Sequence, residues 1–372
     1  MKRIVICADG TWNKQDQIDD ASGKRRPTNV TKMARAVKTQ GDDGIDQVVY
    51  YHSGVGTGGP MDELTGGAFG HGMESNIRAM YRFILYNHAP GDELYLFGFS
   101  RGAFTVRSLA GFLHRYGLVR KGDDFYVPEM YACYEQNIAT GSDAWSKMFT
   151  NRRGLPRIQK ARECPPITFL GVWDTVGALG APGVIGQLFN SKRYQYHDVQ
   201  LNPSIRFAAH ALALDERRKA FEPTLFVKPA NWTGTLAQTW FAGVHSNVGG
   251  SYDPDGLANE ALHWIAAHAR SAGLSLDADY LRFFTPRFDS TLNDSYGAMY
   301  KLMQLGQPRT RQVGQGPAAE ETLHHSVLKR RDNTEPQRTY PAYRPPQPAA
   351  AIDALPVVDT PEDLPAPLAL RA

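Results

Sequence analysis

Residues 93–103 read Glu93-Leu94-Tyr95-Leu96-Phe97-Gly98-Phe99-Ser100-Arg101-Gly102-Ala103, an apolar strand pattern that runs directly into Gly-x-Ser-x-Gly. A helical pattern follows over 103–116. A serine raised on a tight turn between a strand and a helix has strained backbone angles, and glycines two residues before and after it leave room where the two elements nearly touch. The arrangement predicts a nucleophile elbow, with Ser100 as the nucleophile and Gly98 and Gly102 as its spacers.

The same turn supplies a hydrogen-bond donor. The elbow places Arg101 at the start of the helix, so its backbone N–H has no acceptor within the helix and, together with the helix dipole, it can stabilise a developing oxyanion. A serine hydroxyl becomes a strong nucleophile only when a base removes its proton. The chain must therefore supply a histidine, and an acid to orient it, after Ser100.

The loop after the first apolar run is the candidate source of a second oxyanion donor, because enzymes with this elbow take one from the loop after an early strand. It reads Asp9-Gly10-Thr11-Trp12-Asn13. Gly10 permits close backbone approach. We therefore expect the N–H of Thr11 or Trp12 to be this donor, with Asp9 and Asn13 bracing the turn. An ordinary Asx turn is the alternative interpretation.

Two polar residues follow later apolar runs in the order that an α/β-hydrolase requires, which is Ser, Asp or Glu, then His. Asp174 comes directly after the run at 167–173 and fits the orienting acid, although aspartate also follows strands as a helix cap or turn residue. His245 comes after the run at 240–244 and precedes Ser246-Asn247-Val248-Gly249-Gly250. Of the eleven histidines, His245 has this setting between a strand and a glycine pair, and we expect it to be the base.

Apolar runs of strand length recur along the chain and alternate with helical patterns. The expected strands are Ile4–Ala8, Gln47–His52, Glu93–Phe99, Ile167–Trp173 and Thr239–Val244. The expected helices are Met73–Tyr86, Ala103–Tyr116, Ile205–Asp215 and Leu257–Ser271. This alternation predicts an α/β fold of the α/β-hydrolase kind, a mostly parallel sheet with helices on both faces. Two long loop insertions, Gly54–Gly72 and Lys121–Pro166, are expected to cover a pocket.

The domain organisation follows from composition and length. With 42% hydrophobic and 21% charged residues, the 372-residue chain can form a large core. The last 66 residues hold 11 of the 24 prolines, and no helical or strand period is visible from about residue 345 onward. We expect a catalytic domain over 1–345 and a Pro/Ala-rich flexible tail over 346–372.

Charge and cysteine content exclude several classes of protein. A formal net charge of +3 over this length gives no reason to expect a nucleic-acid partner. Three cysteines without Cys-x-x-Cys disfavour a disulfide scaffold or zinc ribbon. The apolar stretch at 4–8 meets Asp9 too early for a signal peptide, and no run is long enough for a transmembrane helix. We expect a protein that is cytoplasmic on synthesis.

Two further motifs resemble ligand sites, but the residues around them lack the features that such sites need. Gly54-Val55-Gly56-Thr57-Gly58-Gly59 matches the dinucleotide fingerprint, yet Pro60 follows and the next helical pattern waits until about Met73, so no helix N-terminus meets a pyrophosphate. Asp253-Pro254-Asp255-Gly256 lacks the other oxygen ligands of a calcium loop. We expect a glycine-rich loop near the active site and an acidic turn, with no cofactor and no metal.

Four motifs taken together carry a resemblance to a known family. They are Asp9-Gly10-Thr11-Trp12-Asn13, Gly98-Phe99-Ser100-Arg101-Gly102-Ala103, Val172-Trp173-Asp174-Thr175-Val176-Gly177 and Val244-His245-Ser246-Asn247-Val248-Gly249-Gly250-Ser251-Tyr252. In this order they resemble the bacterial α/β-hydrolase family of type VI secretion phospholipase effectors, and the segments at 211–223, 325–327 and 343–345 agree with it. The resemblance spans roughly residues 3–345.

The resemblance implies a serine hydrolase that cleaves ester bonds, with phospholipids as the best-known substrate class. It further implies transient contact with a membrane surface, export by a type VI apparatus, and an immunity or secretion-apparatus protein as partner. Two alternatives stay open at this point. One is a cytosolic carboxylesterase for small soluble esters, and the other is a binding protein that keeps the hydrolase fold without catalysis.

Overall fold

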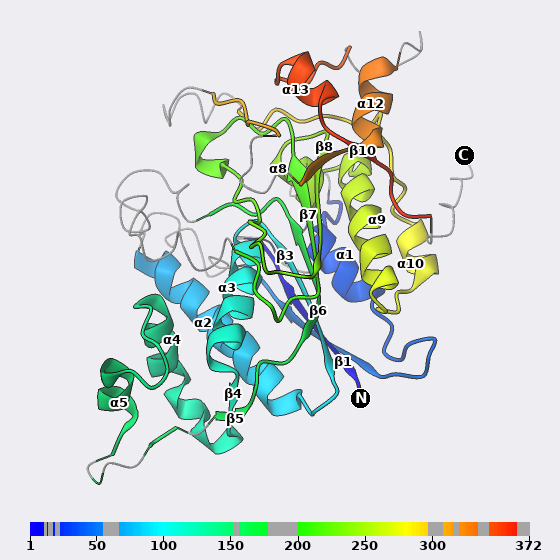
Figure 1. Cartoon of the computed structure of the whole chain (residues 1–372). Coiled ribbons are helices and arrows are strands. Elements are labelled where there is room, and N and C mark those ends of the chain that lie inside the picture. Colours follow the sequence, from blue (N-terminus) through cyan, green and yellow to red (C-terminus); the bar gives the residue numbers. More distant parts are fainter. Residues whose placement is uncertain are drawn as a thin grey trace.

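The centre of the molecule is a sheet of eight parallel strands in the order β10-β9-β8-β7-β6-β3-β1-β2 (Figure 1). The strands are β1 (Arg3–Ala8), β2 (Gln47–His52), β3 (Glu93–Phe99), β6 (Ile167–Trp173), β7 (Phe207–Ala213), β8 (Thr235–Phe241), β9 (Glu321–His324) and β10 (Val357–Val358). The computed structural model describes residues 1–10, 13, 18, 23–54, 67–151, 153, 156–158, 160–177, 200–296, 308–314, 320–333 and 342–362. The expected α/β-hydrolase-like class is confirmed.

Helices cover both faces of this sheet, as Figure 1 shows. One face carries α2 (Gly67–Asn87), α3 (Arg101–Tyr116) and α4 (Val127–Glu135), and the other carries α1 (Asn29–Ala36), α9 (Gly256–Ser271) and α10 (Ala278–Arg282). The period of two along a strand divides β1 between the two cores. Ile4 and Ile6 pack with α2 and α3, whereas Val5 and Cys7 pack with α1 and α9. Burial on both faces explains why these strands read as continuous apolar runs.

β7 corrects one expectation, because the sequence pattern at Ile205–Asp215 predicts a helix. Alanine and leucine favour helices, but intrinsic propensity is a weak prior that packing overrides. Here the segment pairs with β6 on one side and β8 on the other. Its small side chains, such as Ala209 and Ala211, lie in the same core cluster as residues of α9. The alanines therefore serve close helix-on-sheet packing.

The C-terminal region also differs from the expectation of a flexible tail over 346–372. Within it, α13 (Ala349–Asp353) is followed by β10, which adds to the sheet beside β9. Ile352 and Leu355 are buried in a third core cluster that includes residues of β8, β9 and α12 (His325–Asp332). A five-residue helix and a two-residue strand are stable only when docked, so their own pattern gives little signal. Residues 363–372 lie outside the described ones.

The insertion expected at Lys121–Pro166 has secondary structure of its own. It contains η2 (Lys121–Tyr126), α4, α5 (Asp143–Phe149) and β5 (Lys160–Arg162), and β5 pairs antiparallel with β4 (Leu118–Val119). Most of the glycine-rich insertion at Gly54–Gly72 lies outside the described residues. Among the described residues, no helix combines the length and the apolar character needed to cross a bilayer.

The sheet topology brings the candidate site together. β2 lies on one side of β1 and β3 on the other, so the order reverses at β1. In open parallel sheets the crevice outside the carboxyl ends of the strands at such a switch point binds ligands. Gly10 follows β1 and Ser100 follows β3, so both lie at this edge.

Candidate active site

Ser100 lies on the sharp turn between β3 and α3, with backbone angles of φ 58° and ψ −123°. Its N–H donates to Trp173 O at 3.0 Å, which extends the β3–β6 pairing by one step. A Cβ at Gly98 would come within 2.6 Å of Gly102 O, and one at Gly102 within 2.2 Å of Ala8 O. Both positions therefore require glycine, because backbone atoms occupy the space that a side chain would need.

The loop after β1 runs directly against this turn. A Cβ at Gly10 would lie 3.2 Å from Ser100 Cβ, so the backbone passes beside the serine. Arg101 is the first residue of α3, where helix N–H groups lack an acceptor within the helix. Thr11 and Trp12 lie outside the described residues, and a second oxyanion donor in this loop stays a prediction.

Asp9 anchors the base of that loop and is almost fully buried. Its Oδ1 accepts the Gly10 N–H at 2.7 Å, while Oδ2 accepts hydroxyl donors from Thr28 at 2.6 Å, Thr31 at 3.1 Å and Tyr51 at 2.7 Å. Burial raises the pKa of Asp9, and these donors oppose the increase. The carboxyl group thus holds the start of the loop to α1 and β2.

Asp174 and His245 are brought together from two different strands. Asp174 follows β6 with φ 39°, and His245 opens α8 (His245–Gly249), four residues after the end of β8. The His245 Nδ1 and Asp174 Oδ2 atoms are 2.6 Å apart. Gly243, at φ 127°, turns the chain so that α8 begins at the histidine. The expected strand Thr239–Val244 is observed as Thr235–Phe241.

Two aromatic rings enclose the His245 imidazole. The Phe99 ring lies 4.6 Å from it between centroids, and the Phe221 ring of η4 (Lys219–Phe221) lies at 4.9 Å, edge to face. Because Phe99 directly precedes Ser100, this contact brings the imidazole beside the elbow. Burial lowers the pKa of His245, and the hydrogen bond to Asp174 opposes the decrease. The neutral ring, which can accept a proton, is therefore favoured at neutral pH.

Arg311 is the part of this cluster that carries no sequence signal. Its Nη1 lies 2.7 Å from Asp174 Oδ1 and its Nη2 lies 3.0 Å from Asp174 Oδ2, and the side chain is buried. Burial raises the pKa of Asp174, but the charge of Arg311 and the hydrogen bond from His245 outweigh it, so that the pKa lies below its ordinary value. Asp174 is thus held as a carboxylate.

The charged run at 215–219 supports the histidine from its other side. Glu216 is buried, and its Oε2 accepts the His245 backbone N–H at 3.2 Å. It also accepts from the Arg218 guanidinium at 2.9 Å and from Ser295 Oγ at 2.9 Å. Burial would raise the pKa of Glu216, yet the bonds from Arg218 lower it to about 2. This acid braces the backbone of the histidine turn.

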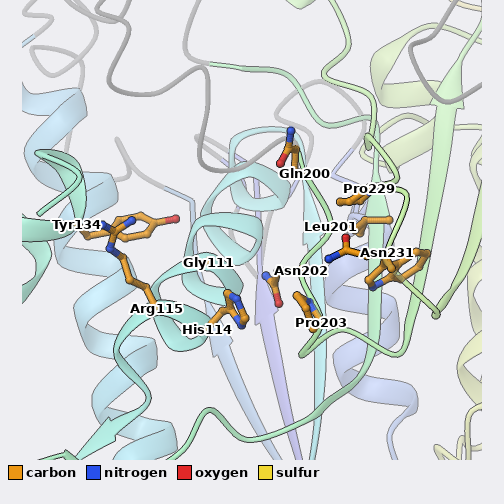
Figure 2. Close-up of a pocket in the computed structure, with 11 residues that line it drawn as sticks. Gly111, His114, Arg115, Tyr134, Gln200, Leu201, Asn202, Pro203, Pro229 and Asn231 are labelled. Atoms are coloured by element: carbon orange, nitrogen blue, oxygen red, sulfur yellow. The ribbon is translucent and has the colours of Figure 1, made fainter. Parts of the chain in front are cut away.

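A separate pocket of about 550 Å³ opens at the far end of α3 (Figure 2). His114 and Arg115 of the last helical turn line it, together with Asn202 and Trp232. None of the residues named above for the candidate site is among its described lining. Among the residues described here, no group of three or more His, Cys, Asp or Glu side chains could hold a metal ion.

The chain is similar to a family described as type VI secretion system phospholipase effector, Tle1-like, catalytic domain, whose model matches residues 2–268. This range includes Ser100, Asp174 and His245 and ends before Arg311. Uncharacterized protein YEL023C of Saccharomyces cerevisiae is 27% identical over 250 residues, covering 60% of this chain and 33% of the yeast protein.

Two solved structures are similar to parts of this chain. An uncharacterized protein from Pseudomonas aeruginosa is 18% identical with a TM-score of 0.45, covering 77% of this chain and 49% of that one. The Tle1 effector bound to the VgrG spike of the type 6 secretion system is 20% identical with a TM-score of 0.39, covering 68% and 51%. The chain thus spans a third of the yeast relative and about half of each solved chain.

Proposed function

Because this chain belongs to the Tle1-like phospholipase effector family of type VI secretion, we propose that it is a serine hydrolase that cleaves the carboxylic ester bonds of phospholipids. The family is that of phospholipase effector catalytic domains. In the proposed mechanism Ser100 is the nucleophile, His245 the base and Asp174 the orienting acid.

One observation supports this proposal most strongly. His245 Nδ1 lies 2.6 Å from Asp174 Oδ2, and the same imidazole ring packs against Phe99, the residue before Ser100. A carboxylate at Nδ1 holds the proton there and leaves Nε2 free to accept another. The strained elbow beside it offers a hydroxyl at the edge of the sheet. Nucleophile, base and acid are thus supported by three separate strand ends.

The proposed reaction has two halves. Ser100 Oγ attacks the ester carbonyl carbon while His245 Nε2 takes its proton, and the tetrahedral oxyanion receives hydrogen bonds from the Arg101 N–H and from the loop after Gly10. The intermediate collapses, His245 returns the proton to the departing alcohol, and an acyl group remains on Ser100. In the second half, water attacks the acyl group while His245 takes its proton, and collapse of the second intermediate returns that proton to Ser100 Oγ and releases the fatty acid. No cofactor or metal takes part in these steps.

Family membership also supports the proposed substrate and partners. Effectors of this kind act after export, so we include a protein of the type VI apparatus and an immunity protein among the partners, with transient contact at a phospholipid surface. A second hydrolase of the same mechanism, a carboxylesterase for small soluble esters, differs only in acyl-chain preference. The test below separates the two.

The test compares wild type with Ser100→Ala on short-chain and long-chain p-nitrophenyl esters and on phosphatidylethanolamine–phosphatidylglycerol vesicles. We expect a loss of at least about 10⁴-fold in kcat with the fold intact. A fluorophosphonate probe, from which Ser100 Oγ would displace fluoride, should label wild type but not Ser100→Ala. Ser271→Ala is the matched control, because Ser271 ends α9 at the surface and its hydroxyl donates to His268 O. Equal labelling of Ser100→Ala and wild type would refute the nucleophile.

A preference for long chains or vesicles supports the phospholipase, and a preference for short soluble esters replaces it with the esterase. Absence of both turnover and labelling in folded wild type would favour a binding protein that keeps the hydrolase fold.

A further inference from the structure

Arg311 reaches the candidate site from a distant part of the chain. It lies in the segment 308–314, 137 positions after Asp174, and only 3% of it is exposed. Besides its two bonds to Asp174, its Nη1 donates to Ala213 O at 2.6 Å and its Nη2 donates to Phe221 O. Gln347 donates to the Arg311 carbonyl at 3.3 Å. The guanidinium is therefore held on several sides.

The geometry of the contact fixes the orientation of the carboxylate. Asp174 Oδ1 accepts from Ala213 N at 2.9 Å and from Arg311 Nη1, while Oδ2 accepts from Arg311 Nη2 and faces His245 Nδ1. A planar guanidinium that meets both oxygens prevents rotation of the carboxylate, which a single donor or a lysine ammonium cannot do. The oxygen that faces the imidazole is thus set by Arg311.

The positive charge of Arg311 also affects the protonation of the Asp174–His245 pair. The Asp174–His245 pair carries a net charge of −1 when it can accept the serine proton and is neutral once protonated, so a nearby cation opposes protonation wherever in the pair the proton sits. Arg218 and Glu216 also face His245, but they pair with each other at 2.9 Å and largely cancel. His210, whose Nε2 accepts the Thr175 N–H at 3.1 Å, is neutral because burial lowers its pKa to about 3.

We propose that Arg311 is a positioning residue of the hydrolase, which locks the Asp174 carboxylate against the His245 imidazole and keeps this pair in its proton-accepting form. The inference rests on the function proposed above. It assigns a role to a residue outside the range of the family match, residues 2–268.

The test uses the full chain with Arg311→Met, Arg311→Lys and a control. Arg309→Met is the matched control. Arg309 lies on the same segment, but its side chain is 53% exposed and its ion pair with Glu222 is long, at 3.5 Å. kcat and KM are measured across pH with a p-nitrophenyl ester, and the His245 ring is titrated by NMR, assigned with His245→Gln. Circular dichroism identifies any variant that does not fold.

For Arg311→Met we expect kcat to fall about 100-fold with KM within about twofold, because the acid is mispositioned while substrate contacts persist. The acid limb of kcat and the His245 titration should both move upward by about one pH unit or more. Arg311→Lys should keep the acid limb near its wild-type position but lose about tenfold in kcat, since it retains the charge without the fork. Arg309→Met should match wild type.

A folded Arg311→Met whose His245 titration and acid limb are unchanged overturns the inference. If that variant does not fold, Arg311→Lys decides, and a wild-type kcat in it would refute the positioning role. If wild type neither turns over esters nor labels, while Arg311→Met still shifts the His245 titration, the hydrolase function fails and the electrostatic hold of Arg311 on the pair stands.

Discussion

The two halves of the candidate site are held in place by opposite means. The elbow half, Gly98–Gly102, depends on side chains that are missing, since backbone atoms of β1 and α3 fill the space beside its glycines. The acid–base half, made of Asp174, His245 and Arg311, depends on buried charges that hold one another. The first is built within five neighbouring residues, and the second joins segments up to 137 positions apart.

The two halves therefore tolerate different kinds of substitution. In the elbow half an added Cβ meets backbone, that of α3 at Gly98 and that of Ala8 and Asp9 at Gly102, so α3 would have to move away from β3 or from β1. In the acid–base half a change of charge matters more than a change of volume, because a buried ion that loses its partner is costly.

Asp174→Asn keeps the shape of the acid–base half and changes its charge. We expect kcat to fall by about 10⁴-fold, because an amide NH₂ facing His245 favours the wrong tautomer of the imidazole. The free energy of unfolding should also fall by roughly 3 kcal/mol, since Arg311 loses its counter-charge. Steady-state kinetics on a p-nitrophenyl ester and urea unfolding measure the two effects.

The chain offers a matched control for that substitution. Asp359 Oδ1 lies 3.0 Å from His325 Nδ1, the same kind of pair on the surface, with the two side chains 70% and 40% exposed. Asp359→Asn should change stability by less than about 0.5 kcal/mol and leave kcat unaltered. Full activity in Asp174→Asn would place the orienting acid elsewhere.

Gly102→Ala adds one carbon to the elbow half and no charge. The new Cβ would lie 2.2 Å from Ala8 O and 2.4 Å from Asp9 O. We expect the free energy of unfolding to fall by roughly 3 kcal/mol, at the upper end for overpacking, because both contacts are to backbone. Gly122→Ala in η2 is the control, since its Cβ meets nothing within 4 Å. Equal Tm values for the two variants would show that the elbow yields more easily than the geometry implies.

The same contrast explains what the sequence alone could predict. The strands Gln47–His52, Glu93–Phe99 and Ile167–Trp173 are predicted to the residue. In Glu93–Phe99 and Ile167–Trp173, burial on both faces leaves an apolar run that ends at a polar residue. The edge strand Gln47–His52 is only half-buried, and its pattern is a short run of valine and tyrosine between two polar residues. The glycine spacing around Ser100 likewise expresses a local steric need. Both are properties of short stretches of chain.

What the sequence could not predict depends on distant neighbours. The sequence of β7 predicts a helix because it is rich in alanine. In the structure these alanines allow α9 to pack closely on the sheet. Arg311 stands in no motif, and only the fold brings it to Asp174. In the same way α13 and β10 are stabilised by packing and pairing with the rest of the fold, including β9. Their Pro/Ala-rich sequence gives no sign of these contacts.

Another buried carboxyl group, that of Asp215, extends the contrast, because it lacks the guanidinium fork that Asp174 has. Asp215 Oδ2 accepts the Gly243 N–H at 2.6 Å and the Tyr343 hydroxyl at 2.9 Å. Burial outweighs these donors and raises the pKa of Asp215 from 3.8 to about 6. The folded state therefore binds more protons than the unfolded state between these values, so this group makes the protein lose stability as pH rises through that window.

Asp215→Asn removes that titration while keeping the size of the side chain. The free energy of unfolding of the variant minus that of wild type should rise by about 2 kcal/mol as the pH is raised from about 4.5 to about 7.5. Urea unfolding at several pH values measures this difference. Taking the difference between the two proteins removes the opposite pH dependence of Asp174 and Glu216, whose pKa values are lowered by guanidinium partners. Asp279→Asn, at an 86% exposed side chain, should show no such change. A difference that stays flat with pH would mean that Asp215 is as well compensated as Asp174, and that a buried carboxylate in this fold does not need a guanidinium to stay charged.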